Sequence, residues 1–151
     1  MTRTRIAIAA CAAIVLTATL AVSSPAATQH FYATLSGAQE VPAEGDPDGS
    51  ATVTFTVSPT KGLCYVFRLR KLETPQAAHI HRGKKGKAGA ILLNLFTRAR
   101  TPKDGKISGC AKITASQLGQ IAAKPSSFYV NLHTKKSPSG AARGQLTTKR
   151  P

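Results

Sequence analysis

Acidic residues are scarce in this sequence: six Asp and Glu stand against 21 Lys and Arg, so the formal net charge is +15. The carboxylates are Glu40, Glu44, Asp46, Asp48, Glu73 and Asp104. They form no recognisable hydrolase site, and neither a convincing Ser-His-Asp order nor a phosphate-binding glycine motif is present. The alternating Glu44, Asp46 and Asp48 lack the glycine and distal glutamate of an EF-hand, which indicates a solvated loop. These absences favour a binding or structural module over an enzyme.

Charge is absent altogether from residues 6–22, an apolar run that follows a short positive start containing Arg3 and Arg5. Small residues follow at 23–27, so the segment predicts a secretory signal peptide of residues 1–26, cleaved after Ala26. An uncleaved membrane anchor is the alternative, because the run reaches the short edge of the roughly 17–25 residues that span a bilayer. Cleavage leaves residues 27–151 as a single domain without a transmembrane segment, located in the cell envelope or secreted.

Cysteine is also rare. Of the three cysteines, Cys11 is lost with the signal peptide, which leaves Cys64 and Cys110. An exported protein meets oxidising conditions, so an even number of cysteines predicts a disulfide bond between these two. The bridge would close a loop of about 46 residues and contribute roughly 4 kcal/mol in the loop-entropy description. The alternative is two buried thiols that never meet.

The remaining chain has the pattern of a β protein. Apolar residues alternate with threonine over residues 50–58, and residues 63–72 alternate again with Cys64 on the arginine-bearing face. Residues 90–97 are almost wholly apolar, which predicts a strand interior to a sheet or buried on both faces. Residues 114–123 are the one helical candidate, with Thr114 as its cap. We expect an all-β fold: an antiparallel Greek-key sandwich or flattened barrel of about eight strands with one short helix.

Two stretches place histidine on strands. In residues 77–83, His79 and His81 share one face because side chains alternate along a strand. In residues 128–134, Tyr129, Asn131 and His133 share a face in the same way. Each stretch leads into a basic loop and then a Gly-Ala pair, so we interpret them as two similar hairpins.

Three histidines on neighbouring hairpins form a candidate metal site. Neutral imidazoles suit copper and zinc, and His79, His81 and His133 would supply three nitrogens while leaving room for water or a substrate. The alternative is structural: histidines at strand ends hydrogen-bond loop backbone groups and hold the hairpins in register.

Basic residues in and beside the two loops form a candidate anion-binding set, comprising Arg82, Lys84, Lys85, Lys87, Lys135, Lys136 and Arg143. If the hairpins are neighbours, the loops form one cationic rim around the histidines. Such a rim attracts anionic cell-envelope polymers, acidic polysaccharides or lipid head groups. We expect no nucleic-acid partner, because the protein is exported and aromatic side chains for base stacking are few. A solubilising surface is the alternative.

Several motifs carry a resemblance to a known family. In order along the chain they are residues 35–42 (Leu-Ser-Gly-Ala-Gln-Glu-Val-Pro), 78–83 (Ala-His-Ile-His-Arg-Gly), 129–134 (Tyr-Val-Asn-Leu-His-Thr) and 144–146 (Gly-Gln-Leu). They resemble the CHRD domain, named for chordin and widespread in exported bacterial proteins. The resemblance covers residues 31–148 and implies the fold and an exported location more than an activity. We expect the protein to act as a binding or structural module.

A more distant similarity is to copper–zinc superoxide dismutase. That family also has a His-x-His strand and a later strand that ends in histidine, followed by a segment like residues 140–144. No histidine lies between His81 and His133, so the bridging and zinc histidines of that family have no counterpart. The similarity implies copper or zinc handling, or redox activity, as the alternative function.

Overall fold

The computed structural model describes residues 28–151, so the expected signal peptide, residues 1–26, lies outside the described residues. The strands are β1 (His30–Ser36), β2 (Ser50–Ser58), β3 (Gly62–Arg70), β4 (Ala77–Arg82), β5 (Ile91–Phe96), β6 (Lys106–Ala111), β7 (Phe128–His133) and β8 (Ala142–Gln145). One α-helix, α1 (Ala115–Ala123), and two short 3-10 helices, η1 (Gly37–Gln39) and η2 (Pro125–Ser127), complete them. Within this part of the chain, no helix is long and apolar enough to cross a membrane.

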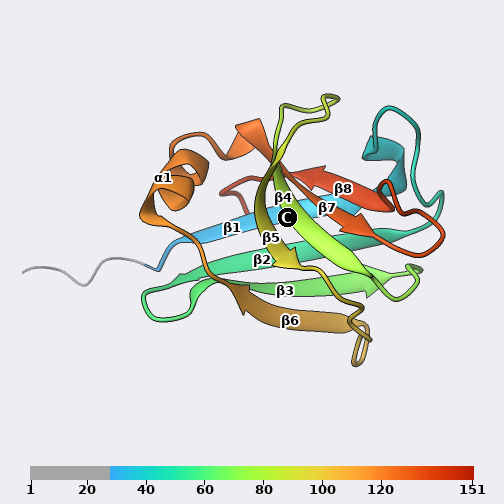
Figure 1. Cartoon of the computed structure of the whole chain (residues 1–151), viewed down its shortest axis with the longest axis horizontal. Coiled ribbons are helices and arrows are strands. Elements are labelled where there is room, and N and C mark those ends of the chain that lie inside the picture. The colour runs from blue at the N-terminus through green and yellow to red at the C-terminus, as the bar shows by residue number, and fades with distance from the viewer. Residues whose placement is uncertain (1–27) are drawn as a thin grey trace, which may run out of the picture.

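All eight strands belong to one antiparallel sheet with the order β5-β4-β7-β8-β1-β2-β3-β6 (Figure 1). The sheet curls until its two edge strands, β5 and β6, lie near each other, which makes a nearly closed barrel. The predicted all-β class is confirmed, and the flattened barrel is the form adopted. Both predicted hairpins are present, since β4 pairs with β5 and β7 pairs with β8.

The core fills the inside of the barrel. Because side chains alternate along each strand, β1, β2 and β3 all send one face inward, where Phe31, Phe55 and Phe67 are fully buried. Phe67 packs edge-on against Phe55 and Phe96 at centroid distances of 6.4 and 6.3 Å. Burial of each such ring contributes about 1.5–3 kcal/mol, so this inward face is what fixes the register of the sheet.

Helix α1 begins where the sequence predicted. The Thr114 side chain accepts the Gln117 amide, and the Gln117 side chain accepts the Thr114 amide, which together form a capping box. Ile121 is fully buried, and the Gln117 side-chain amide donates to the Leu92 carbonyl, so α1 is tied to β5.

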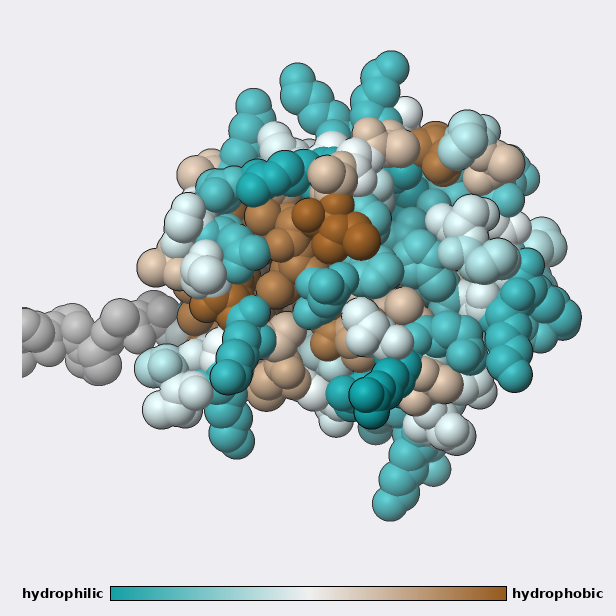
Figure 2. Space-filling view, viewed as in Figure 1, coloured by the Kyte–Doolittle hydropathy of each residue, from teal (hydrophilic) through white to brown (hydrophobic). Residues whose placement is uncertain are grey.

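The position predicted for the apolar strand was wrong in one respect. Strand β5 lies at an edge of the sheet and not in its interior, and Ile91 is 50% exposed. Figure 2 shows the resulting apolar patch near the start of β5, surrounded by hydrophilic side chains. Leu92 and Leu93 are nevertheless both buried although they are consecutive, because the pairing with β4 is irregular and α1 is bonded to the strand.

The predicted disulfide is present in the structure. Cys64 on β3 and Cys110 on β6 are directly opposite each other, with their sulfur atoms 2.08 Å apart. Both lie on the outer face of the barrel, as the alternation with Arg68 indicated. The bridge therefore fastens the edge strand β6 to β3 without using core volume.

Candidate metal centre

The pairing of β4 with β7 brings the three predicted histidines together. In this antiparallel register Ala77 is opposite His133, and His79 is opposite Asn131. Ile80 is fully buried in the barrel, so the histidines lie on the outer face of the sheet. His79 Nδ1 is 3.1 Å from His133 Nε2, and one nitrogen of each of the three rings lies within 4.8 Å of the others.

Backbone carbonyls fix the protonation of two of these rings. His81 Nδ1 is 2.9 Å from the Gly89 carbonyl, and His133 Nδ1 is 2.9 Å from the Pro138 carbonyl. A carbonyl only accepts, so each Nδ1 carries the hydrogen and each neutral ring keeps its lone pair on Nε2. His81 Nε2 is buried and has no hydrogen-bond partner among residues 28–151. Metal-bound histidines are commonly oriented by this type of bond from the second ring nitrogen.

The surroundings keep two of the imidazoles neutral. Burial, together with positive charge on His133 and His81, lowers the pKa of His79 from 6.5 to about 4. Burial is also the main cause that lowers the pKa of His81, against the bond to Gly89, which raises it. The neutral form is the one that binds a metal ion, so the lowered pKa values favour coordination at neutral pH.

The Tyr129 ring packs against the His81 ring. The two rings stack at 4.8 Å with an interplanar angle of 5°. Strand β8 pairs with β7 on the side away from β4. From β8, the Arg143 guanidinium carbon lies 3.7 Å from the centre of the Tyr129 ring. The Tyr129 hydroxyl accepts the Gly89 amide at 3.2 Å. Tyr129 therefore holds the residue whose carbonyl orients His81.

Glu40 is a site residue that the sequence did not reveal. It is only 7% exposed, and the Asn131 side-chain amide donates to both of its carboxylate oxygens, at 2.8 and 3.0 Å. Burial raises the pKa of Glu40 to about 7, although the charge of Arg143 and the Asn131 bond act in the opposite direction. A Cβ at Gly140 would lie 2.7 Å from the Glu40 carboxyl carbon, so the glycine makes room for this carboxylate.

The side-chain oxygen of Asn131 has no hydrogen-bond partner in the described residues. Asn131 Oδ1 is buried without a partner in the described part of the chain, as is His81 Nε2. Asn131 is opposite His79 and on the same face, so both orphan acceptors belong to one outer-face site on β4 and β7. Buried acceptors are normally satisfied, and a bound cation with its water is one way to satisfy both.

The only sequence signal for Glu40 was its place in residues 35–42, one of the motifs that carried the resemblance.

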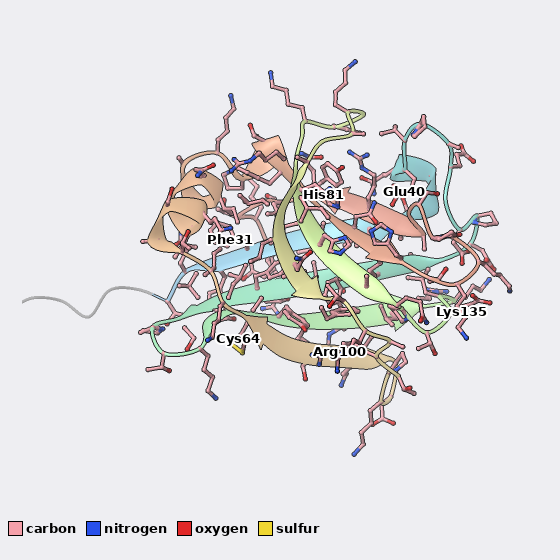
Figure 3. The ribbon with its side chains drawn as sticks, in the orientation of Figure 1. Phe31, Glu40, Cys64, His81, Arg100 and Lys135 are labelled. Carbon is pink, nitrogen blue, oxygen red and sulfur yellow. A yellow bond between two sulfur atoms is a disulfide. The ribbon has the colours of Figure 1, made fainter. Side chains whose placement is uncertain are left out.

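The structure does not bring the predicted cationic residues into one rim. Because β4 and β7 are antiparallel, the loops that follow them leave from opposite ends of the sheet, and Figure 3 shows Lys135 well away from His81. The prediction of a shared rim is therefore wrong in its geometry. Lys84, Lys85 and Lys87 lie in the β4–β5 loop, and Lys135 and Lys136 lie in the β7–β8 loop.

Three of the cations also have partners within the protein. Lys136 pairs with Glu73 at 2.8 Å, and Arg82 donates to the Gln120 side chain while lying 6.0 Å from the Phe128 ring centre. Arg143 is 3% exposed and donates to the Lys87 carbonyl at 2.8 Å. It lines one side of a 280 Å³ cavity that Lys85, Gln145 and Glu40 also line.

An antiparallel barrel with buried polar residues on its outer face defines this chain as a small all-β module. Residues 31–146 match the CHRD domain, and the chain belongs to the CHRD domain family. Neither the curated proteins nor the solved structures gave a significant match to this chain. Membership of the family supports a binding or structural module, and CHRD domains are typically extracellular.

Proposed function

We propose that this protein is an exported CHRD module that binds one copper or zinc ion through His79, His81 and His133. The convergence of three imidazole nitrogens within 4.8 Å carries this proposal. Two of the rings are held by backbone carbonyls through Nδ1, which leaves the lone pair on Nε2, so part of the coordination geometry exists before the metal arrives. The ion would replace the hydrogen bond between His133 Nε2 and His79 Nδ1.

The nitrogen separations suit a shared ion. Nitrogens bound to zinc lie about 2.0–2.1 Å from it, so two of them at a tetrahedral angle are about 3.3 Å apart. The 3.1 Å between His79 Nδ1 and His133 Nε2 is close to this value. The nitrogen of His81 lies within 4.8 Å of the other two, so this ring has to move toward the pair when the ion binds. Three protein ligands leave a fourth position open for water or a small ligand.

Copper and zinc are both favoured by a set of three imidazoles, and the two ions lead to different functions. Zinc would act without redox change, as a structural or Lewis-acid centre. Copper would allow metal handling or electron transfer, in line with the distant similarity to superoxide dismutase.

Metal analysis of protein purified without chelator and without a histidine tag tests the proposal. We expect one ion per chain, or stoichiometric uptake when copper or zinc is titrated into the apoprotein. His81→Ala should abolish the uptake while the barrel stays folded. His30→Ala is the matched control, because His30 lies on β1 and contacts Thr56. Wild-type protein that takes up no metal at micromolar concentration would leave the histidines as structural residues.

An anionic cell-envelope polymer is the second candidate ligand. The observation that favours it is the exposed β4–β5 loop, where Lys84, Lys85 and Lys87 form no ion pair within residues 28–151. Lys85 also lines the 280 Å³ cavity with Arg143. The double variant Lys84→Gln with Lys85→Gln should reduce retention on purified cell envelopes, whereas retention equal to wild type would count against this loop.

Export is part of the proposal. It is supported by the charge-free run at residues 6–22, by the disulfide and by the family. Mass spectrometry of protein from a secreting host should find a chain that begins at Ala27. An intact residue 1–26 segment on membrane-embedded protein would contradict it.

A further inference from the structure

Three cations stand in one row on the outer face of the barrel, away from the histidines. Arg68 on β3 is directly opposite Lys106 on β6. Lys106 is in turn opposite Lys103, and the two exchange backbone hydrogen bonds of 3.0 and 2.9 Å across a turn. Residues directly opposite each other in an antiparallel pair point to the same face, and all three side chains are exposed. The row lies near the start of β6, and Arg100, which follows the end of β5, is labelled in this region in Figure 3.

The fold gives no reason for this row. Like charges directly opposite each other destabilise a sheet. The turn needs Asp104 and Gly105, which have φ values of 51° and 68°, but it does not need lysine on both sides. The two ion pairs within residues 28–151 join Lys71 to Asp48 and Lys136 to Glu73, so none of the three cations forms an ion pair, and Asp104 in the turn is the one carboxylate between them in sequence.

Hydroxyl groups and one apolar side chain extend the row into a larger surface. Thr52 on β2 is opposite Arg68, so the row reads Thr52, Arg68, Lys106, Lys103 across neighbouring strands. In the next row, Thr54 and Ser108 flank Val66, which is 39% exposed.

We propose that this face binds a linear anionic polysaccharide that carries one carboxylate on each sugar. Neighbouring strands lie about 4.8 Å apart, so Arg68 and Lys103 are two strand spacings apart with Lys106 between them. In an extended polymer the carboxylates of successive sugars point to alternate sides, so those that face the sheet, on about every second sugar, can meet these cations. The arginine can hold a carboxylate through two parallel N–H bonds. The Thr52 hydroxyl and the Val66 methyl groups then contact sugar hydroxyls and the apolar side of a ring.

The composition of the face selects this partner over other polyanions. Single-stranded nucleic acid binds through a series of stacking aromatic rings, whereas the second row offers one ring, the half-buried Tyr32 that is opposite Thr54 on β1. A membrane surface calls for large apolar side chains that enter the lipid, and Val66 is the one exposed apolar residue in these rows. The surface lies on β3 and β6, so it is independent of the metal centre on β4 and β7.

Binding to polygalacturonate tests the proposal. The ladder variant Arg68→Gln with Lys106→Gln removes two charges from the row. The control variant Lys61→Gln with Lys124→Gln removes two exposed charges elsewhere, at the far end of β3 and after α1. We expect the ladder variant to lose about tenfold in affinity, as for two exposed ion pairs, and the control to lose less than about threefold. Thermal unfolding without the polymer should show that both variants are folded. Lys103→Gln removes a charge of the same row at a position outside the strands, and it should also weaken binding.

The proposal would be overturned by equal losses in the ladder and control variants, by no binding of wild-type protein to polygalacturonate at low salt, or by equal binding to uncharged dextran. Stronger binding to anionic phospholipid vesicles than to polygalacturonate would also overturn it. His81→Ala should bind polygalacturonate like wild type, so this outcome is separate from that of the metal proposal.

Discussion

His79 Nδ1 lies 3.1 Å from His133 Nε2, although 54 residues separate the two in sequence. The contact follows from the register of β4 and β7, in which His133 is opposite Ala77 and therefore diagonal to His79. A shift of this register by one residue would move His133 to the core face. The buried Ile80, Val130 and Leu132 prevent such a shift, so the barrel core itself holds the histidine cluster together.

The first prediction concerns metal and pH. Copper or zinc should raise the melting temperature at pH 7, because a ligand that binds only the native state adds about 4 kcal/mol at a thousandfold excess over Kd. The gain should disappear as the pH approaches 4, where His79 takes up a proton. Scanning calorimetry with and without zinc at pH 7 and pH 4 checks this. A zinc-dependent shift that persists at pH 4 would contradict it, and His79→Ala should show no shift at either pH.

Tyr129→Phe should weaken metal binding without unfolding the protein. The substitution keeps the ring that stacks on His81 and removes the hydroxyl that holds Gly89. Loss of such an outer support typically costs 10–100-fold in metal affinity, so we expect about tenfold. Copper titration followed by electron paramagnetic resonance should show both the weaker affinity and a changed spectrum. Tyr32→Phe on β1 is the control and should leave both unchanged.

Glu40 should impose a pH dependence on stability. Its pKa rises from 4.5 in the unfolded chain to about 7 in the folded protein, so the folded state binds more protons between these values. The stability it contributes is therefore complete below pH 4.5 and is lost as the pH rises through 7. The shift corresponds to roughly 3 kcal/mol.

Urea unfolding of wild type and Glu40→Gln from pH 4.5 to 8 checks this sign. The free energy of unfolding of the wild type should fall relative to that of the variant as the pH rises. His79 contributes in the opposite direction below pH 6.5, but it does so in both proteins. Glu44→Gln, an exposed carboxylate in the same loop, should keep the wild-type slope. Parallel curves for wild type and Glu40→Gln would refute a raised pKa.

Removal of the disulfide should lower the free energy of unfolding. Cys64 and Cys110 are 46 residues apart, and the loop-entropy description assigns roughly 4 kcal/mol to a loop of that length. We expect the double variant Cys64→Ser with Cys110→Ser to show this loss in urea. Native unreduced protein should also resist alkylation, and two thiols that react before reduction would show that the bridge is absent in solution.

The sequence was sufficient for several features that depend on local pattern. Alternation placed Ile80 inward and His79 and His81 outward, and the Thr114 cap located α1. The even cysteine count identified the disulfide. These follow from residue periodicity, capping chemistry and redox environment, which are all properties of one segment or one residue pair.

Features that depend on which strands are neighbours could not be obtained in this way. Period-2 alternation assigns faces to a strand but does not specify its partners or its direction. The antiparallel pairing of β4 with β7 is why Lys85 and Lys135 lie at opposite ends and not in one rim. Glu40 was hidden for the same reason, since its partner Asn131 is 91 residues away. The row formed by Arg68 and Lys106 likewise exists only in the β3–β6 register.

The two free edges of the sheet are secured very differently. Strand β6 is covalently joined to β3 through Cys110, whereas β5 is held by an irregular pairing with β4, by its buried side chains and by single hydrogen bonds from Gln117 and Tyr65. Local opening of the native barrel should therefore start at β5 and spread no further than β4 while the rest stays closed. In hydrogen-exchange measurements the amides of β5 would exchange first, and β4, which bears His79 and His81, would be protected when metal joins it to β7.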